Sequence, residues 1–242
     1  MKRLITILLL IAMIMTFSIG ANATDKEPYM SVSGTKEATE TQMELAANLS
    51  KDGLAVNRTV EEALATVQGA RSTNWIYTDR YFYYYGQEQN YTCGPASVRM
   101  ALRNITGEEY SESVISAGCN TTASEGTYLA DMVTYINSMQ NHNTYIAKYK
   151  DTKATMKSNL YKGIVNWDAP PIVGLKETTS DGWNYNLGGH FVVVYGVYSN
   201  QKKYAVTDPW SGFIGDSANR DITVSVNMMY TAYSAVNIGY MF

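Results

Sequence analysis

The clearest hydrophobic pattern in the chain is helical and lies near its middle. Apolar side chains recur at i, i+3, i+4, i+7 and i+10: Leu129, Met132, Val133, Ile136 and Met139. This spacing places them on one face of an α-helix and predicts that this face packs against a core. A second helical pattern starts after Cys93 and stops at residues 104–107, and a shorter one covers residues 109–117.

The second half of the chain is dominated by strand-like runs. Four of them are rich in β-branched and aromatic residues and are separated by Gly, Asn and Asp turns: residues 170–176, 190–198, 202–210 and 235–242. Residues 74–86 and 143–150 also indicate strands, and residues 152–164 a short helix. Because helices gather in the first half and strands in the second, the pattern predicts an α+β fold with a mainly antiparallel sheet.

The N-terminus carries a different hydrophobic pattern. Lys2 and Arg3 precede an apolar run from residue 4 to 19, and a small-x-small exit, Ala-Asn-Ala, ends at Ala23. This order is typical of a secretory signal peptide, which predicts removal of residues 1–23 and a secreted or cell-envelope protein. A permanent membrane anchor is the alternative, but the run is short for the ~20 residues that a spanning helix needs. No later stretch is apolar enough to span a bilayer, so we expect no permanent membrane span.

Residues 24–74 predict an N-terminal helical extension or pro-segment. Residues 24–36 are polar, and residues 37–50 become helix-forming. Thr59, with Glu62 three positions later, forms a capping box ahead of a second short helix. These helices carry little apolar area, so we expect the main folded domain to cover residues 75–242.

Composition excludes several classes of function. Loss of Lys2 and Arg3 changes the formal charge from −3 to −5, and no Lys or Arg cluster remains, so we expect no nucleic-acid partner. Two cysteines are too few for a disulfide-dense scaffold. Two histidines without a Cys/His cluster predict neither a metal site nor a cofactor.

The segment QEQNYTCGPAS, residues 87–97, has the features of a reactive-thiol site. Cys93 lies where a loop ends and a predicted helix begins. The unpaired N–H groups and the positive dipole at the start of a helix favour a thiolate over a thiol. Gly94 allows close approach of the backbone, and Pro95 suits the first helical turn because its missing N–H costs nothing there. Cys93 is therefore a candidate nucleophile.

A nucleophilic thiol needs a base, and the chain has two histidines. His142 lies in a polar turn, where we expect it to be solvated, whereas His190 opens a β-branched strand directly after Gly188 and Gly189. An antiparallel return over the turn at residues 200–203 would bring Asp208 back to the level of His190, where it could orient the imidazole. A packed histidine and an ordinary Asp-Pro turn are the structural alternatives.

An oxyanion intermediate needs hydrogen-bond donors. The backbone N–H of Cys93 can supply one, and a side-chain amide upstream can supply another. Gln87 and Gln89 both precede Cys93 closely, and chemistry alone does not choose between them.

These motifs together resemble a known family. QEQNYTCGPASVRMAL, then GGHFVVVYGVY and VTDPW, resemble the bacteriocin-processing, double-glycine-leader cysteine peptidases, peptidase family thirty-nine, which have a papain-like fold. The resemblance runs from about Gly86 to the C-terminus. It implies that Cys93 is the nucleophile, His190 the general base and acid, Asp208 the orienting residue and Gln87 the oxyanion donor. It also implies a helical part carrying Cys93 packed on a sheet carrying the other two.

The chain departs from that family in context. It shows an export signal and neither transporter segments nor an ATP-binding motif, so specificity for double-glycine leaders does not carry over. The leading hypothesis is a secreted cysteine peptidase acting on peptides or proteins through a thioester acyl-enzyme. A thiol acyltransferase or amidase would use the same site. A catalytically inactive binding module, with Cys93 bridged to Cys119, is the non-enzymatic alternative; closing that loop would stabilise the fold by about 3 kcal/mol.

Overall fold

The computed structural model describes residues 74–242, and the structural statements below concern this part of the chain. The predicted signal peptide and almost all of the predicted extension at residues 24–74 lie outside it. Among the described residues, no helix combines the length and the apolar character needed to cross a membrane.

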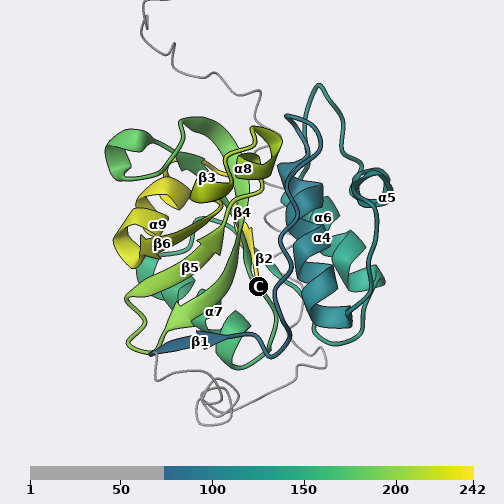
Figure 1. The fold of residues 1–242 in the computed structure, drawn as a ribbon. Coiled ribbons are helices and arrows are strands. Elements are labelled where there is room, and N and C mark those ends of the chain that lie inside the picture. The colour runs from purple at the N-terminus through teal and green to yellow at the C-terminus, as the bar shows by residue number, and fades with distance from the viewer. Residues whose placement is uncertain (1–73) are drawn as a thin grey trace, which may run out of the picture.

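A single antiparallel sheet forms the centre of the fold (Figure 1). Its path is β2-β7-β3-β4-β5-β6, and β1 pairs with the far half of β4. Every pairing is antiparallel, so the predicted mainly antiparallel α+β fold is confirmed. The strands are β1 (Trp75–Tyr77), β2 (Ala147–Lys148), β3 (Ile172–Glu177), β4 (Leu187–Tyr198), β5 (Lys203–Thr207), β6 (Asp221–Ser225) and β7 (Tyr240–Met241).

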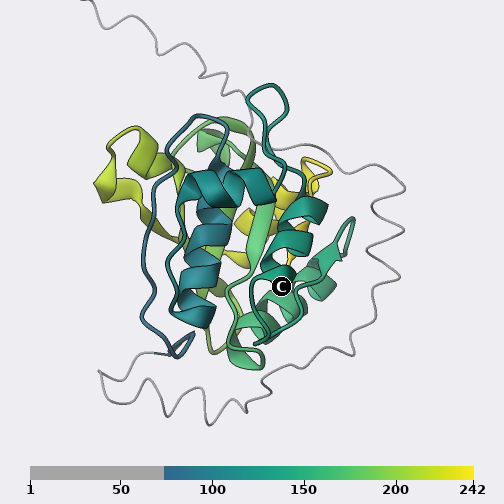
Figure 2. The ribbon, with the colours of Figure 1, turned by 90° about the vertical axis from the view of Figure 1, so that its right-hand side faces the viewer.

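Helices cover the sheet on both sides. The helices α4, α5 and α6 form one layer, seen to the right of the sheet in Figure 1 and facing the viewer in Figure 2, while α7 and α9 lie on the other side. The helices are α4 (Cys93–Thr106), α5 (Glu112–Gly118), α6 (Leu129–Ser138), α7 (Lys153–Val165), α8 (Trp210–Phe213) and α9 (Val226–Ser234), with short 3₁₀ turns η1 (Thr179–Asp181) and η2 (Ser217–Asn219).

Alternation along β4 divides the core into two clusters. Phe191 and Val193 pack with the residues of α4, α5 and α6, in a cluster that also contains Cys93 and Cys119. The intervening residues of β4 pack with α7 and α9 on the other face. Successive side chains of a strand point to opposite faces, so one continuous apolar strand serves both halves of the core.

Local signals explain where several helices begin and end. Thr152 and Ser225 cap α7 and α9 by accepting a hydrogen bond from a backbone N–H three residues ahead. Helix α4 ends at Gly107, which adopts the left-handed conformation (φ 78°) and donates its N–H to the Arg103 carbonyl.

Several segments differ from the expected elements. The strand predicted at residues 143–150 is present only as the two-residue strand β2. The aromatic run at 74–86 is a strand only as far as Tyr77, and beyond that point the strand prediction was wrong. The rings of Tyr83 and Tyr85 instead lie under the guanidinium groups of Arg103 and Arg99 on α4, at 4.7 and 4.1 Å from ring centroid to Cζ. These cation–π contacts bind the run along the helix rather than into the sheet.

The C-terminal region differs as well. Residues 226–234 form the unpredicted helix α9, and within the run 235–242 only Tyr240 and Met241 are strand. The Ser225 cap was the available signal for α9.

Candidate active site

Cys93 is the first residue of α4 and is buried in the core cluster beneath that helix. Thr92, which precedes it, makes no side-chain cap bond, so the donors at this helix start are not taken up by a capping side chain. Gly94 allows the tight packing here: a Cβ at this position would lie 2.9 Å from the Cβ and Oγ1 of Thr127 and 3.2 Å from the sulfur of Met132. The thiol is thus held at the positive end of a 14-residue helix.

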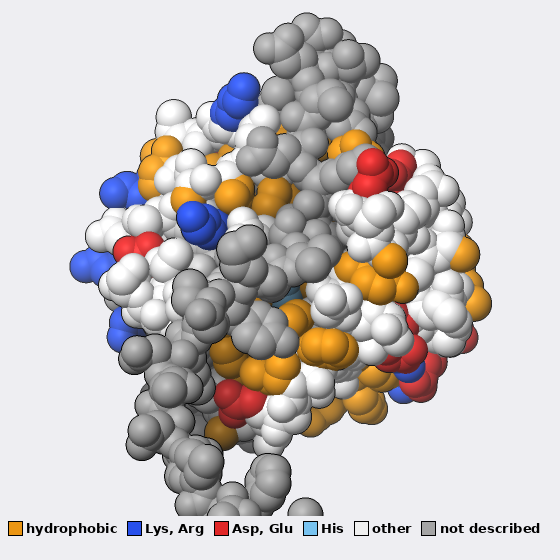
Figure 3. Space-filling model, turned by 90° about the horizontal axis from the view of Figure 1, so that it is seen from above, with side chains coloured by type: hydrophobic (Ala, Val, Ile, Leu, Met, Phe, Trp, Pro, Cys, Tyr) orange, Lys and Arg blue, Asp and Glu red, His pale blue; other side chains and the backbone are white. Residues whose placement is uncertain are grey.

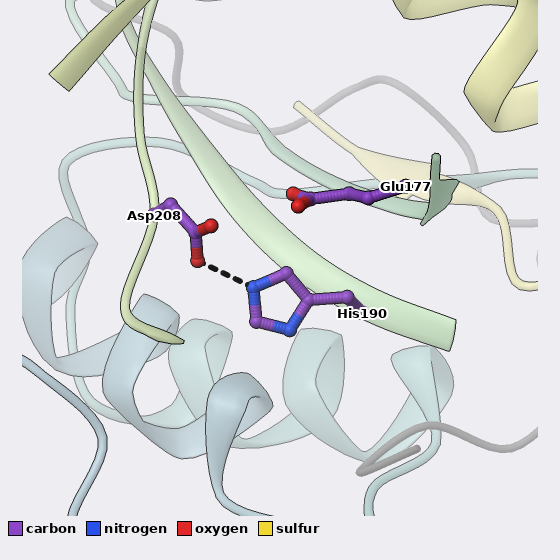
Figure 4. A group of neighbouring side chains, drawn as sticks. All are labelled: Glu177, His190 and Asp208. Carbon is purple, nitrogen blue, oxygen red and sulfur yellow. Dashed lines mark hydrogen bonds and ion pairs between the residues drawn. The ribbon is translucent and has the colours of Figure 1, made fainter. Parts of the chain in front are cut away.

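His190 and Asp208 come together through the β4–β5 hairpin. The strands pair with Val193 opposite Thr207, so Asp208, one residue beyond β5, reaches back toward the start of β4. The Nε2 of His190 lies 2.6 Å from the Oδ1 of Asp208, and both side chains are buried (Figure 4). This is the arrangement that the antiparallel return predicts.

The Asp208 carboxylate is held by its own backbone surroundings. Its Oδ1 also accepts the backbone N–H of Trp210 at 2.8 Å. The backbone N–H of Asp208 donates to the Arg220 carbonyl at 2.9 Å, and its carbonyl accepts the Ser211 hydroxyl at 2.8 Å. These bonds fix the carboxylate, and through it the imidazole, in one orientation.

Cys93 and His190 form a side-chain hydrogen bond. Because Nε2 is bonded to Asp208, Nδ1 is the ring nitrogen that faces the thiol. Burial lowers the pKa of His190, but the charges of Asp208 and Cys93 outweigh it and raise this pKa well above its usual value. The surroundings therefore favour the imidazolium form of His190, the cation that accompanies the reactive form of such a thiol site.

Of the two candidate glutamines, Gln87 is buried next to the turn that follows Asp208, whereas Gln89 is exposed. Gln87 is buried, and its backbone N–H donates to the Pro209 carbonyl at 3.0 Å, which links it directly to the turn that follows Asp208. Its amide nitrogen donates to the Gln89 carbonyl at 2.7 Å, whereas the Gln89 side chain is exposed. A primary amide has two N–H donors, so one remains for a ligand.

The remaining cysteine and histidine are placed elsewhere. Cys119 follows α5, is buried and unbridged, and has its pKa raised by burial and by Asp131. The Cys93–Cys119 bridge considered above is therefore not formed in this structure. His142 is half-buried and contacts the Trp167 carbonyl at 3.2 Å, so the prediction of a solvated side chain was wrong in degree.

Glu177 is a member of the cluster that sequence reasoning missed. It ends β3, is buried, and its carboxylate points toward the His190–Asp208 pair (Figure 4). Ligand atoms of the three residues all lie within 4.8 Å of one another. The signal in the sequence was a charged residue at the end of the apolar run PPIVGLKE.

Lys and Arg as well as Asp and Glu side chains are visible on the face of the molecule seen from above (Figure 3). Hydrophobic side chains form several groups on the visible part of this face, and charged side chains of both signs lie around them (Figure 3).

Comparison with known proteins gave similarities to peptidases. The chain is similar to the peptidase domain of Streptococcus ComA, described as a bifunctional ABC transporter involved in a quorum-sensing pathway. The identity is 17%, the TM-score 0.46, and the match covers 67% of this chain and 97% of that one. It is also similar to the proform of the ragweed pollen allergen Amb a 11, a cysteine protease, with 10% identity, a TM-score of 0.47 and coverage of 83% and 73%. No curated protein matches the chain.

The family comparison covers the region that holds this cluster. The Peptidase_C39 like family matches residues 79–237, more than half of the 242-residue chain. Cys93, His190 and Asp208 all fall inside the matched range, as does Gln87. The chain belongs to the Peptidase_C39 like family and is a cysteine peptidase.

Proposed function

We propose that this protein is a secreted cysteine peptidase that hydrolyses peptide bonds through Cys93, His190 and Asp208, with Gln87 as an oxyanion donor. One observation carries the proposal: the thiol at the start of α4 is hydrogen-bonded to an imidazole whose other nitrogen is 2.6 Å from a fixed carboxylate. Secretion rests on the signal-peptide pattern at residues 1–23.

The reaction follows from these positions. The Cys93 thiolate attacks the peptide carbonyl carbon, and the negative charge that develops on the carbonyl oxygen is received by the Cys93 N–H and the second amide hydrogen of Gln87. His190 then gives its Nδ1 proton to the leaving amine, which breaks the C–N bond and leaves a thioester on Cys93. The neutral imidazole next takes a proton from water, whose oxygen attacks the thioester and releases the acid.

Each residue has a distinct physical task in this scheme. Asp208 keeps the imidazole ring in place and stabilises its positive charge, because its carboxylate is fixed by Trp210 and cannot turn away. Gln87 is tied to the same turn through Pro209, so the oxyanion donor and the orienting carboxylate move together.

The first experiment is single labelling of the thiol. The protein is treated briefly with iodoacetamide at pH 6 and its intact mass is measured, with Cys119→Ala as the matched control for Cys93→Ala. We expect one rapid label in the parent and in Cys119→Ala, and none in Cys93→Ala. Both thiols are buried, but Cys93 is hydrogen-bonded to His190, whereas burial and Asp131 raise the pKa of the Cys119 thiol. Rapid labelling that survives Cys93→Ala would contradict the assignment of the nucleophile.

Peptide turnover then tests the reaction itself. A peptide mixture is incubated with the parent and with Cys93→Ala, with and without an added amine, and the products are identified by mass. New C-terminal carboxylates that require Cys93 support hydrolysis. Products that carry the added amine in place of a carboxylate would show acyl transfer and would overturn the peptidase assignment in favour of an acyltransferase.

A further inference from the structure

Glu177 is a buried carboxylate without a hydrogen-bond partner. Its exposed fraction is 1%, and in the described part of the chain neither of its two oxygens finds a donor. A carboxylate in such surroundings carries a large desolvation cost unless a proton or a cation accompanies it. The unsatisfied oxygens therefore call for an explanation.

The strand register directs this carboxylate at the catalytic pair. Glu177 lies opposite Leu187 across the β3–β4 ladder, just after a register shift that follows Leu175. Figure 4 shows its carboxylate facing the His190–Asp208 pair from the neighbouring strand. One ligand atom from each of the three residues lies within 4.8 Å of the others.

The chemistry of this group matches a divalent cation. Two carboxylates and one neutral imidazole supply a charge of −2, which a dication balances. Imidazole nitrogen and carboxylate oxygen are also usual zinc ligands, and three protein ligands leave a fourth position for water. A cation at this point would pair both the Glu177 carboxylate and the Asp208 carboxylate at once.

We propose that Glu177, His190 and Asp208 form an inhibitory site for a divalent cation, for which Zn²⁺ is the best match. Burial and the charge of Asp208 raise the pKa of Glu177 well above its usual value, so this carboxyl holds a proton before the ion binds. Zn²⁺ displaces that proton and the proton on His190 Nε2, and both leave to water, so no net charge enters the site. The Nε2–Asp208 hydrogen bond is replaced by two bonds to the metal. The metal then holds the His190 ring in place, and Nε2 can no longer carry a proton. The imidazole therefore cannot act as the general acid and base.

Cys93 has no place among the ligands of this site. It faces Nδ1, on the opposite edge of the ring from the nitrogen that faces Asp208. This distinguishes the proposed site from zinc held by the reactive thiol and its imidazole, which would need Cys93. The ion-binding proposal therefore stands apart from catalysis, and only its inhibitory effect rests on the proposed function.

The test is calorimetric titration of the whole protein with Zn²⁺ on a Cys93→Ala background. We expect one Zn²⁺ per chain, and at least about tenfold weaker binding when Glu177→Gln removes one ligand. Glu108→Gln is the matched control, since this exposed carboxylate lies beyond the C-terminal end of α4, the end opposite Cys93, and should leave the affinity unchanged. Thermal unfolding of each variant establishes that it is folded before titration.

A second measurement does not depend on any variant at Glu177. Co²⁺ is added to the parent protein and the absorption spectrum is recorded. Nitrogen and oxygen ligands alone give weak visible bands, and a thiolate ligand adds an intense charge-transfer band in the near ultraviolet. Absence of that band from the Co²⁺ complex supports the site; its presence would place the ion on Cys93 and overturn the proposal.

The remaining outcomes separate the two proposals. No Zn²⁺ binding in Cys93→Ala, or equal binding with and without Glu177, would overturn the cation site whatever the enzyme's activity. Binding that requires Glu177, in a protein that cleaves no peptide, would support the cation site and count against the proposed function. Peptidase activity that Zn²⁺ suppresses in the parent, with at least about tenfold higher concentrations needed in Glu177→Gln, would support both.

Discussion

Burial alone lowers the pKa of His190, yet Asp208 and Cys93 raise it well above its usual value because both place negative charge beside the ring. The imidazolium is therefore present at neutral pH and is lost only as the pH rises through the raised value. The stabilisation that this ion pair gives the fold follows the same pH dependence. It is complete below about pH 6.5, the usual histidine pKa, and disappears at alkaline pH.

Asp208→Asn should lower the pKa of His190, since it removes the stronger of the two neighbouring charges. The measurement is a ¹⁵N NMR titration of the imidazole rings, in which His142 serves as an internal reference. Because the chain has only two histidines, the two rings can be assigned with one variant. An unchanged His190 titration in Asp208→Asn would count against this electrostatic account.

The roles of Gln87 and Gln89 can be distinguished by comparing a reaction that forms an oxyanion with one that does not. Peptide hydrolysis forms one, whereas alkylation of the thiol by iodoacetamide does not. We expect Gln87→Ala to lower kcat by about 10²–10³-fold, the usual effect of losing an oxyanion donor, while the alkylation rate of Cys93 stays close to that of the parent. Gln89→Ala is the control. If it lowered turnover as much as Gln87→Ala does, the assignment of Gln87 as the oxyanion donor would be wrong.

Residue chemistry led to Cys93, His190 and Asp208 as candidates, because a helix start, a double glycine and an Asp-Pro step are visible in the sequence. It left Gln87 and Gln89 open, and only the family resemblance chose between them. Glu177 is visible in the sequence only as a charged residue at the end of an apolar run, which does not show where its side chain points. Its direction depends on the register shift between Leu175 and Glu177, and the period-2 pattern of a strand carries no information about such a shift.

At the level of elements, the start of α4 depends on a glycine that has no room for a side chain. An Ala at position 94 would place its Cβ 2.9 Å from Thr127, so α4 or the Thr127 loop must shift. We expect Gly94→Ala to destabilise the protein by about 1–3 kcal/mol and to slow alkylation of Cys93. Thermal unfolding and the labelling rate are the measurements.

Gly188 is the matched control for this prediction. It lies near His190 on β4, but a Cβ there meets nothing within 4 Å. Gly188→Ala should therefore change stability by less than about 1 kcal/mol. A destabilisation by Gly188→Ala as large as that by Gly94→Ala would contradict the packing argument.

Elements with strong internal periodicity were predicted well, and those defined by their neighbours were not. The helix expected at residues 129–139 is α6, one residue shorter, because its apolar stripe alone specifies it. The aromatic run after Tyr77 has high strand propensity, but the arginines of α4 bind it outside the sheet. Strand propensity measures how well a residue fits a half-buried, pleated surface. It does not specify whether the segment packs in the sheet or against a helix.

For the whole molecule, the sequence predicted the fold class and the β4–β5 hairpin but not the order of the sheet. The hairpin is local: a short turn joins two strands, and their pairing follows from it. The placement of β7, the C-terminal strand, between β2 and β3 depends on contacts between residues far apart in the chain. Local patterns do not encode such pairings.

The sheet makes the two core clusters interdependent, and this leads to a prediction about unfolding. Cys119 reports on the cluster beneath α4, α5 and α6, and Trp183 on the cluster on the opposite face. Since β4 supplies side chains to both, neither cluster can come apart without exposing the other. We expect a single cooperative transition in urea, with the same midpoint for both reporters.

Pulse labelling of Cys119 on a Cys93→Ala background gives the first midpoint, and the fluorescence of Trp183, taken as the difference from Trp183→Phe, gives the second. Labelling should remain absent until the global transition, because the Cys119 thiol is fully buried in the native state. Labelling of Cys119 at a urea concentration where Trp183 is still native would show that the helical layer carrying Cys93 opens alone. In that event the thiol and the imidazole would be held together by the Cys93–His190 contact rather than by a common core.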